Sequence, residues 1–153
     1  MMISTAFQTF CRQFTDLELL DVVTIGRRYF YDPAHLLKNA QGVEVFSVGL
    51  YLGEDRRVFQ PTSALIDLLA ARCNRRVVVN SKAAWLFLCN RDILMDSVLE
   101  PGVYSRDALV FVADEEGNIL GYGKIYNPYN KSYANKIYVK HLLDKGEYLR
   151  RER

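Results

Sequence analysis

Apolar side chains recur at helical spacing close to the N-terminus of the chain. One stripe consists of Phe7, Phe10, Cys11 and Phe14. Their spacing of i, i+3, i+4 and i+7 is typical of one face of a helix. Ser4 or Thr5 stands just before the stripe, where a hydroxyl can accept a hydrogen bond from a free amide of the first turn. The pattern therefore predicts a first helix with an aromatic face turned to a core.

The rest of the first half predicts short strands and two further helices. The expected strands cover residues 17–25, 27–31, 43–51 and 56–60, with turns at Gly26 and Gly53. Asp32-Pro33 predicts the start of a short helix over residues 34–39, because Asp is a good capping residue and proline suits the first helical turn. Pro61-Thr62-Ser63 opens the next helix, whose buried face should consist of Leu65, Ile66, Leu68, Leu69 and Cys73.

The second half, beyond the break at residues 74–76, predicts many short strands and few helices. Strands are expected over residues 77–80, 92–95 and 136–140, and a helix or tail over 142–151. Ser81 should cap a short helix on which Trp85 anchors the core. Residues 107–125 give the strongest signal, since two β-branched and aromatic runs flank a Glu-Glu-Gly-Asn turn and so predict a hairpin. Gly121-Tyr-Gly123 predicts a point where backbone or ligand approaches the second of these strands closely.

These elements indicate an α+β protein. We expect an N-terminal α/β domain with an antiparallel sheet, packed on a C-terminal small β-barrel. The chain has 153 residues, half of them apolar, so two small domains can each build a core. No run of eighteen apolar residues and no signal peptide is visible, so we expect a cytoplasmic protein that has no membrane partner.

Charge is distributed unevenly along the chain. Residues 1–74 carry seven basic and eight acidic side chains, and residues 75–119 carry five and seven. Residues 120–153 carry eight basic and three acidic side chains, a net charge of +5. A late basic segment on a near-neutral body indicates one surface suited to a polyanion. The alternative is a solvated surface that happens to be rich in lysine.

Lysines and tyrosines are interleaved over residues 127–141, which contain no acid. Cations hold phosphates and aromatic rings stack on bases, so this combination favours RNA as the partner. The candidate RNA-binding residues are Lys131, Lys136, Tyr138, Lys140, Lys145, Arg150 and Arg151. Lys136, Tyr138 and Lys140 alternate along a strand, so they should share one face and form a platform for a nucleotide. Loop tyrosines more often cover the edge of a core, and that alternative stays open for Tyr126, Tyr129, Tyr133 and Tyr138, of which we expect one or two to contact bases.

Motifs for catalysis and cofactor binding are absent from the sequence. There is no Gly-x-Ser-x-Gly, no phosphate-binding loop that ends in Lys-Ser/Thr, and no Gly-x-Gly-x-x-Gly. His35 and His141 have no metal-ligand spacing to each other or to a cysteine. We therefore expect no enzyme activity, no cofactor, no metal and no small-molecule substrate.

Four segments of the second half resemble the PUA domain, the RNA-binding module named after pseudouridine synthases and archaeosine transglycosylases. They are Val77–Asn80 with the short helix after it, Pro101-Gly102, Asp107–Ala113 with Asp114, and Ile119–Ile125. In PUA domains an early strand and helix precede a pair of strands that ends in Gly-x-Gly. The resemblance implies an N-terminal domain at residues 1–74 and a PUA domain at residues 75–153.

The whole chain is also similar to the Nip-seven family of large-ribosomal-subunit biogenesis factors. Three blocks carry this similarity: Phe46–Gly53, Phe59–Leu69 and Lys145–Glu152. The compact first half matches the archaeal members. The resemblance implies a non-catalytic factor that binds ribosomal or pre-ribosomal RNA through its PUA domain and acts in rRNA processing, in the nucleolus if the protein is eukaryotic. It also implies contacts with the exosome or other ribosome-assembly proteins.

Two alternatives to this function stay open. The first is an RNA-modification enzyme or accessory subunit, because PUA domains often accompany catalytic domains. The 74 residues of the first half are few for such a domain and offer no nucleophile–base pair. The second alternative is an adapter whose main contact is with RNA-processing machinery, and apolar residues left exposed on the first half would support it.

Overall fold

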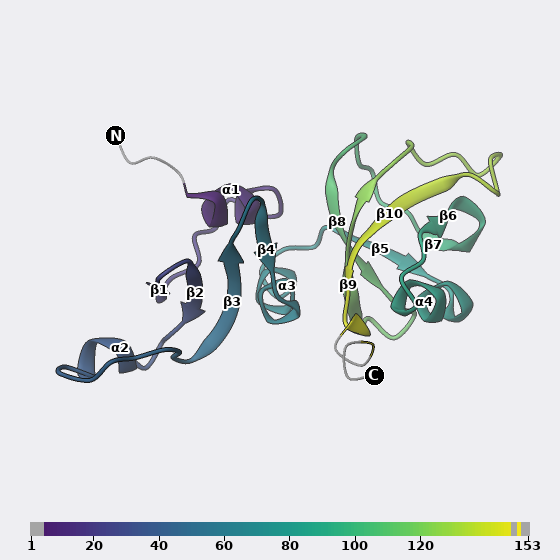
Figure 1. The fold of residues 1–153 in the computed structure, drawn as a ribbon. Helices are drawn as coiled ribbons and strands as arrows, with labels where there is room; N and C mark the ends of the chain where they lie inside the picture. The colour runs from purple at the N-terminus through teal and green to yellow at the C-terminus, as the bar shows by residue number, and fades with distance from the viewer. Residues whose placement is uncertain (1–4, 148–149, 151–153) are drawn as a thin grey trace. The chain divides into compact units, whose positions relative to one another are not determined.

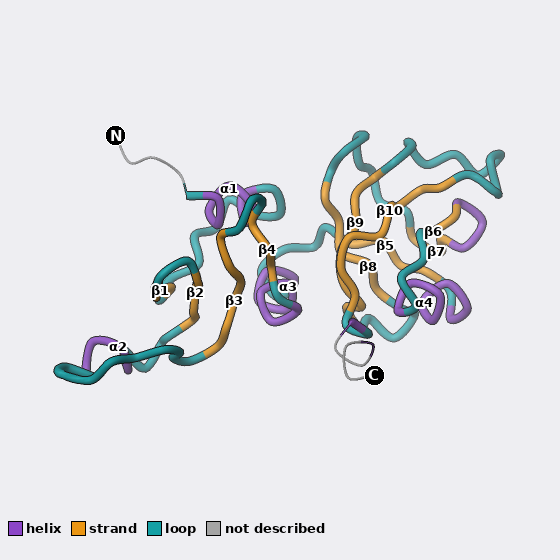
Figure 2. The backbone as a smooth tube through the Cα atoms, viewed as in Figure 1, coloured by secondary structure: helices purple, strands orange, loops and turns teal. Residues whose placement is uncertain are grey.

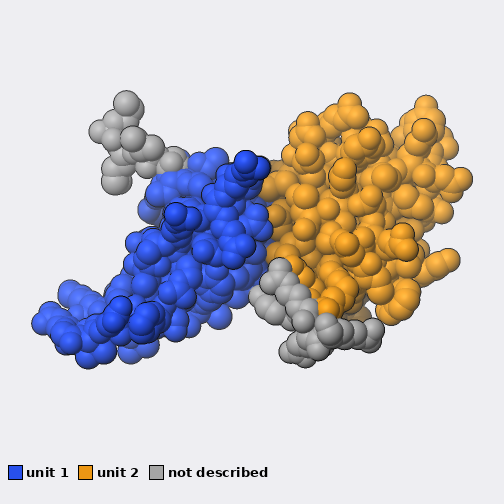
Figure 3. Space-filling model, in the orientation of Figure 1, with its two compact units in different colours: residues 1–72 blue, residues 73–153 orange. Residues whose placement is uncertain are grey.

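The computed structural model describes residues 5–147 and Arg150. The chain divides into two compact units, residues 1–72 and 73–153, which Figure 3 shows in separate colours. The first unit mixes helices with pairs of strands, and the second unit consists mainly of strands (Figures 1 and 2). None of the helices in the described part of the chain is long and apolar enough to cross a bilayer.

The first unit contains three helices and one four-stranded sheet within its described residues. The helices are α1 (Ala6–Arg12), α2 (Leu36–Asn39) and α3 (Ser63–Ala70), and the strands are β1 (Val22–Ile25), β2 (Arg28–Tyr31), β3 (Leu50–Asp55) and β4 (Phe59–Pro61). The sheet order is β1-β2-β3-β4 and every pairing is antiparallel. The antiparallel sheet expected from the sequence is therefore confirmed.

Aromatic packing joins α1 to this sheet, as the helical stripe predicts. Thr5 caps α1 in a capping box with Gln8. The ring of Phe7 stacks on that of Tyr29 in β2, with 4.7 Å between centroids, and meets Phe59 of β4 edge to face. Aromatic pairs of this kind stabilise a core by about 0.5–1.5 kcal/mol beyond the burial of their area.

Several predicted boundaries in this unit are wrong. Residues 17–21 and 43–49 are loop, so β1 and β3 begin later than the apolar pattern indicates. Gly53 lies inside β3 rather than in a turn. Its φ is +152°, and a Cβ there would lie 2.6 Å from the Phe59 ring. Glycine is needed at this position because β4 packs so closely against it.

The second unit contains one helix, one 3₁₀ turn and a six-stranded sheet within its described residues. The elements are β5 (Arg76–Val79), α4 (Ser81–Leu88), β6 (Ile93–Leu94), η1 (Met95–Ser97), β7 (Val98–Glu100), β8 (Leu109–Ala113), β9 (Ile119–Ile125) and β10 (Ile137–Asp144). The strand order is β6-β10-β9-β8-β5-β7, with β5 and β8 parallel and the other pairs antiparallel. The sheet curls around its core into a partly open barrel, which confirms the predicted fold class (Figure 1).

The predicted hairpin is confirmed as β8 and β9. Asp114 closes its turn, because its carboxylate accepts hydrogen bonds from the backbone amides of Glu116 and Asn118 and from the Asn118 side chain. These bonds hold the pKa of the Asp114 carboxyl below its usual value. The acidic turn is thus a structural feature of the hairpin.

Helix α4 covers the core through only part of its surface. Asn80, not Ser81, is the capping residue, and its side chain accepts from the amide of Ala83. Ala83, Ala84 and Phe87 are buried. Trp85 points the other way and is 66% exposed, so the prediction that it anchors the core is wrong. Small residues on the inward face bring α4 close to the sheet, and Phe87 fills the place expected for the indole.

The Gly-Tyr-Gly segment of β9 confirms the predicted close approach. A Cβ on Gly121 would lie 1.9 Å from the carbonyl oxygen of Leu143, and one on Gly123 would lie 2.5 Å from that of Lys140. The approaching backbone is β10, which continues to Asp144. The expected helix or tail over residues 142–151 is therefore wrong for Leu142–Asp144, which extend the strand.

Candidate nucleic-acid interface

The register of β10 decides which of the predicted RNA-binding side chains reach solvent. Against β6, Ile137 pairs with Leu94 and Val139 pairs with Ile93, so a register shift falls at Tyr138. A bulge of this kind breaks the alternation of side chains along a strand. Tyr138 and Val139 are consequently both fully buried, and Lys140 is the first exposed residue after them.

Tyr138 belongs to the core and does not form a platform with Lys136 and Lys140. Its hydroxyl donates to the carbonyl oxygen of Pro101 at 2.7 Å, and its ring meets that of Tyr129 edge to face. Burial raises the pKa of Tyr138 to about 12. The shared face predicted for these three residues is wrong, because the bulge turns the aromatic ring inward while both lysines stay exposed.

Tyr126 occupies the place that the sequence assigned to Tyr138. It follows β9 directly, and its ring is 43% exposed. The guanidinium carbon of Arg106 lies 5.8 Å from the ring centroid, and Nζ of Lys140 lies 5.9 Å from it. Both distances are within the range of cation–π attraction. The backbone is fixed as well, because the Tyr126 amide donates to the Tyr138 carbonyl and Nε of Arg106 donates to the Tyr126 carbonyl.

A further lysine adds positive charge beside this ring. Lys124 and Lys140 lie directly opposite each other on β9 and β10. Like charges in this position destabilise a sheet slightly. Asp107 offsets part of the charge, with 3.9 Å between its Oδ1 and Nζ of Lys124, but its side chain is 74% exposed. We name Arg106, Lys124, Tyr126 and Lys140 the Tyr126 cluster; two of its three cations, Arg106 and Lys140, lie within 6 Å of the centroid of the exposed ring.

The loop between β9 and β10 carries three more of the residues noted in the sequence. Lys131, Tyr133 and Lys136 are all exposed. The loop is held at its end, since the carbonyl of Lys136 accepts from the amide of Met95 and that of Ala134 accepts from the amide of Asp96. Cations and a ring on an anchored loop next to the Tyr126 cluster extend the surface available to a nucleic acid.

Lys145 lies at the opposite end of β10 from Lys136. Eight residues of strand separate them, which corresponds to about 30 Å between their Cα atoms. Lys145 is half-buried, and its amide donates to the Leu120 carbonyl. The four predicted lysines, Lys131, Lys136, Lys140 and Lys145, are therefore spread along the loop before β10 and the length of that strand.

Arg150 is committed to a buried partner. Its guanidinium donates to both carboxylate oxygens of Asp144, at 3.1 and 2.8 Å, and the same carboxylate lies 2.6 Å from Nε2 of His141. Asp144 is 1% exposed, so the arginine neutralises a charge inside the domain. Phosphate binding by Arg150 stays a prediction, and a phosphate would have to share the guanidinium with Asp144. Arg151 lies outside the described residues.

Arg106 and Lys124 were not among the residues selected from the sequence, and Tyr126 was considered there only as one of four tyrosines that could contact a base. Arg106 lies outside the basic segment that the charge count singled out, and Lys124 and Tyr126 precede the lysine–tyrosine interleave. One signal was available: a hairpin over residues 107–125 brings residues 106 and 126 together, because each directly flanks one end of it. Combining the hairpin register with the charge count would have found the pair.

The side chains of the Tyr126 cluster are cationic and aromatic. Within the described residues, no group of three or more His, Cys, Asp or Glu is placed to hold a metal ion. The Tyr126 cluster supplies hydrogen-bond donors, positive charge and a π-face, which are the groups that bind phosphates and bases.

Known structures share this fold. The chain matches a conserved PUA domain protein from Thermoplasma acidophilum with a TM-score of 0.60 at 12% identity, over 95% of this chain and 91% of that one. It also matches a PUA domain from Aeropyrum pernix K1, solved as a tartrate complex, with a TM-score of 0.51 at 17% identity, over 60% and 55% of the two chains.

Sequence comparison places the second unit in a family. A UPF0113 protein from Archaeoglobus fulgidus is 31% identical over 108 residues, which are 69% of this chain and 62% of that protein. The match thus spans less than two thirds of that relative. The family model of the UPF0113 PUA domain matches residues 75–153, which are just over half of the chain. The chain therefore belongs to the UPF0113 PUA domain family.

Proposed function

We propose that this protein binds single-stranded or looped RNA through the Tyr126 cluster of its PUA domain. One observation carries the proposal. Tyr126 is exposed, and the cationic groups of Arg106 and Lys140 both lie within 6 Å of the centroid of its ring. A base can stack on such a ring while the cations hold the phosphates that flank it. Membership of a PUA domain family supports RNA as the ligand.

We further propose that the RNA is ribosomal or pre-ribosomal and that the protein acts in assembly of the large subunit. The similarity of three sequence blocks to the Nip-seven family supports this role. An archaeal UPF0113 protein as a relative is consistent with the archaeal type. The exosome and other assembly proteins are the partners that such a role suggests, and the cytoplasm is where an archaeal protein would meet them.

We propose that the protein is not an enzyme. The cluster combines cations with a tyrosine ring, a set that binds RNA and orients it. The first unit has 72 residues, which is small for a catalytic domain. Incubation of the full chain with ribosomal and transfer RNA, followed by nucleoside analysis, tests this part; a modified nucleoside would overturn it.

Filter binding with the full chain tests RNA recognition. The probes are single-stranded fragments of large-subunit rRNA, fragments of small-subunit rRNA, and transfer RNA, each at several salt concentrations. We expect affinity to fall steeply with salt and to be highest for large-subunit fragments. Folded protein that binds none of them at low salt would refute RNA binding, and equal affinity for all three would refute only the ribosomal assignment.

A further inference from the structure

The first unit has an open sheet edge at β1. β1 is the outermost strand of its sheet and pairs only with β2 among the described strands. Ile25 and Arg28 flank the two-residue turn, and the Asp32 amide donates to the Asp21 carbonyl at 2.8 Å. In an antiparallel ladder, pairs of residues that exchange hydrogen bonds alternate with pairs that do not. β1 therefore bonds to β2 at Ile25, Val23 and Asp21. The backbone groups of Val22 and Thr24 therefore face outward, away from β2.

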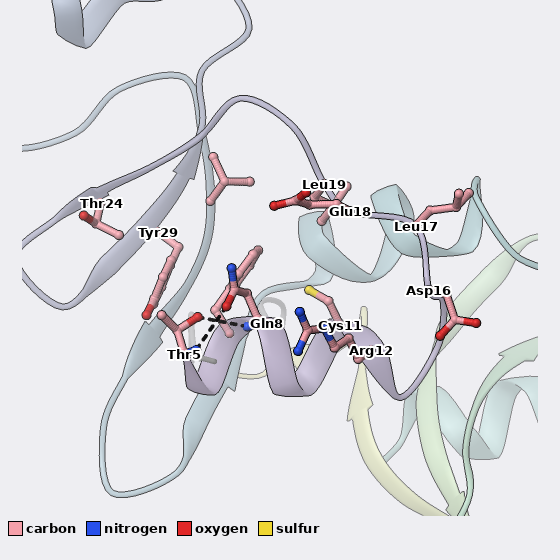
Figure 4. Close-up of a pocket in the computed structure, with 12 residues that line it drawn as sticks. Thr5, Gln8, Cys11, Arg12, Asp16, Leu17, Glu18, Leu19, Thr24 and Tyr29 are labelled. Atoms are coloured by element: carbon pink, nitrogen blue, oxygen red, sulfur yellow. Dashed lines mark hydrogen bonds between the residues drawn. The ribbon is translucent and has the colours of Figure 1, made fainter. Parts of the chain in front are cut away.

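A hollow lined by both apolar and polar side chains lies beside this edge, on the face of the sheet that α1 covers. It has a volume of about 480 Å³ and is bounded by α1, by the loop over residues 16–19 and by β1 (Figure 4). Val22 and Thr24 line it from the strand, and Cys11 lines it from the helix. Leu17 also lines it and is 61% exposed. Together with Val22 and Cys11, Leu17 offers apolar surface that an entering side chain can contact.

Charge at this site has the opposite sign to that of the Tyr126 cluster. Asp16 and Glu18 stand at the rim of the hollow, and Asp21 directly precedes β1. All three are exposed, and Arg12 is the one cation among the residues that line the hollow. The lining residues therefore carry a net charge of −1, since Asp16 and Glu18 outnumber Arg12. An RNA strand would be repelled here, while a partner that carries Lys or Arg would be attracted.

We propose that β1 binds an extended segment of a partner protein, in which apolar residues alternate with basic ones. The segment adds a fifth strand by bonding to the outward backbone groups of Val22 and Thr24. Residues that pair with these two positions project over the same face of the sheet, so an apolar side chain of the partner enters the hollow beside Leu17. The basic side chains lie at the acidic rim. Main-chain bonds supply affinity and the hollow supplies specificity in this mode of recognition.

The observations favour this occupant over a second copy of the chain. Two copies joined antiparallel through β1 about Val23 would pair Val22 of one molecule with Thr24 of the other, so neither copy would place a large apolar side chain in the other's hollow. A small apolar ligand would fill the hollow but would leave the edge of β1 unpaired. The second copy is an outcome of the test below.

The test uses the full chain and a random-peptide phage library as the source of the probe. The highest-ranking peptide is synthesised, and its binding is measured by fluorescence anisotropy. Thr24→Pro removes the outward N–H without removing a ladder bond to β2, because proline is tolerated on the free side of an edge strand. Leu17→Glu changes an exposed loop residue, so the fold does not depend on it. The matched control is Leu36→Glu in α2, where the leucine is 53% exposed.

We expect the selected peptides to alternate apolar and basic residues. Thr24→Pro and Leu17→Glu should each weaken binding by about tenfold or more, and Leu36→Glu should leave it unchanged. Amide exchange should slow at Val22 and Thr24 when the peptide binds. Failure to select such peptides, or equal binding to Thr24→Pro, would overturn the proposal. So would sedimentation showing a wild-type dimer that Thr24→Pro dissociates. RNA binding by Thr24→Pro should equal that of wild type, which keeps this proposal separate from the Tyr126 cluster.

Discussion

Replacement of Tyr126 by alanine tests the RNA interface most directly. Tyr126 is 43% exposed. Its backbone amide and carbonyl, rather than its side chain, make the hydrogen bonds to Tyr138 and Arg106. Tyr126→Ala should therefore change the free energy of unfolding by only about 0.5 kcal/mol. A base that stacks on the ring contributes about 1–3 kcal/mol. RNA affinity should thus fall by roughly 5- to 150-fold.

The salt dependence separates the ring from the charges around it. Tyrosine carries no charge, so Tyr126→Ala should shift the plot of log affinity against log salt downward without changing its slope. Lys140→Gln removes one phosphate contact, so the slope should become shallower by about 0.7 for a single strand. Tyr126→Phe keeps the π-face and serves as the matched control, which should bind like wild type.

Filter binding of a single-stranded rRNA fragment at several potassium chloride concentrations measures both quantities. Circular dichroism and thermal melts confirm that each variant is folded. Wild-type affinity for Tyr126→Ala at every salt concentration would refute the stacking site. A reduced slope for that variant would also contradict the reasoning, because it would mean that the ring acts by positioning Arg106 and Lys140 rather than by contacting a base.

Three predictions concern the stability of the PUA domain and are read from chemical or thermal unfolding. Phe87→Ala empties a fully buried position, so it should lower the free energy of unfolding by about 3–5 kcal/mol. Gly121→Ala should lower it too, because a Cβ there meets the Leu143 carbonyl at 1.9 Å; a folded variant with the wild-type melting temperature would disprove the close approach. Tyr138→Phe removes the bond to Pro101 and should cost about 1–2 kcal/mol. Burial raises the Tyr138 pKa from 10 to about 12, so its proton is held more tightly in the folded state. The stability that this provides is complete below pH 10 and is lost as pH rises to about 12, and Tyr138→Phe should flatten that decline.

Local signals in the sequence predicted much of the fold. The caps of α1 and α3 and the hairpin of β8 and β9 each depend on residues close together in the chain. The predicted strand boundaries were wrong where apolar residues belong to loops rather than strands, as in residues 17–21 and 43–49. Leu17, Leu20, Val43 and Phe46 are all more than 60% exposed. A pattern of apolar residues carries no information on whether a chain segment finds a partner strand.

Side chains that meet through tertiary contact were harder to predict. Trp85 was placed in the core because indole is large and apolar, but the small residues on the inner face of α4 leave room only for Phe87. Arg150 was assigned to phosphate because it is a cation near the end of the chain. Its partner in the structure, Asp144, becomes buried only when β10 packs on α4 and the sheet. Neither burial nor pairing follows from residue type alone.

The two register shifts of β10 explain both the failed platform and the observed one. The first falls between Ile137 and Val139 against β6, and the second falls between His141 and Leu143 against β9. A regular strand would hold Tyr138 and Lys140 on one face, which would expose the ring and leave the core without its largest fully buried side chain. The first shift moves the ring into the core, and the segment between the shifts keeps Lys140 opposite Lys124 and above Tyr126. The prediction that side chains alternate along β10 was therefore wrong at Tyr138. The same irregular strand places Lys140 against the exposed ring of Tyr126, and the RNA-binding proposal requires this pair.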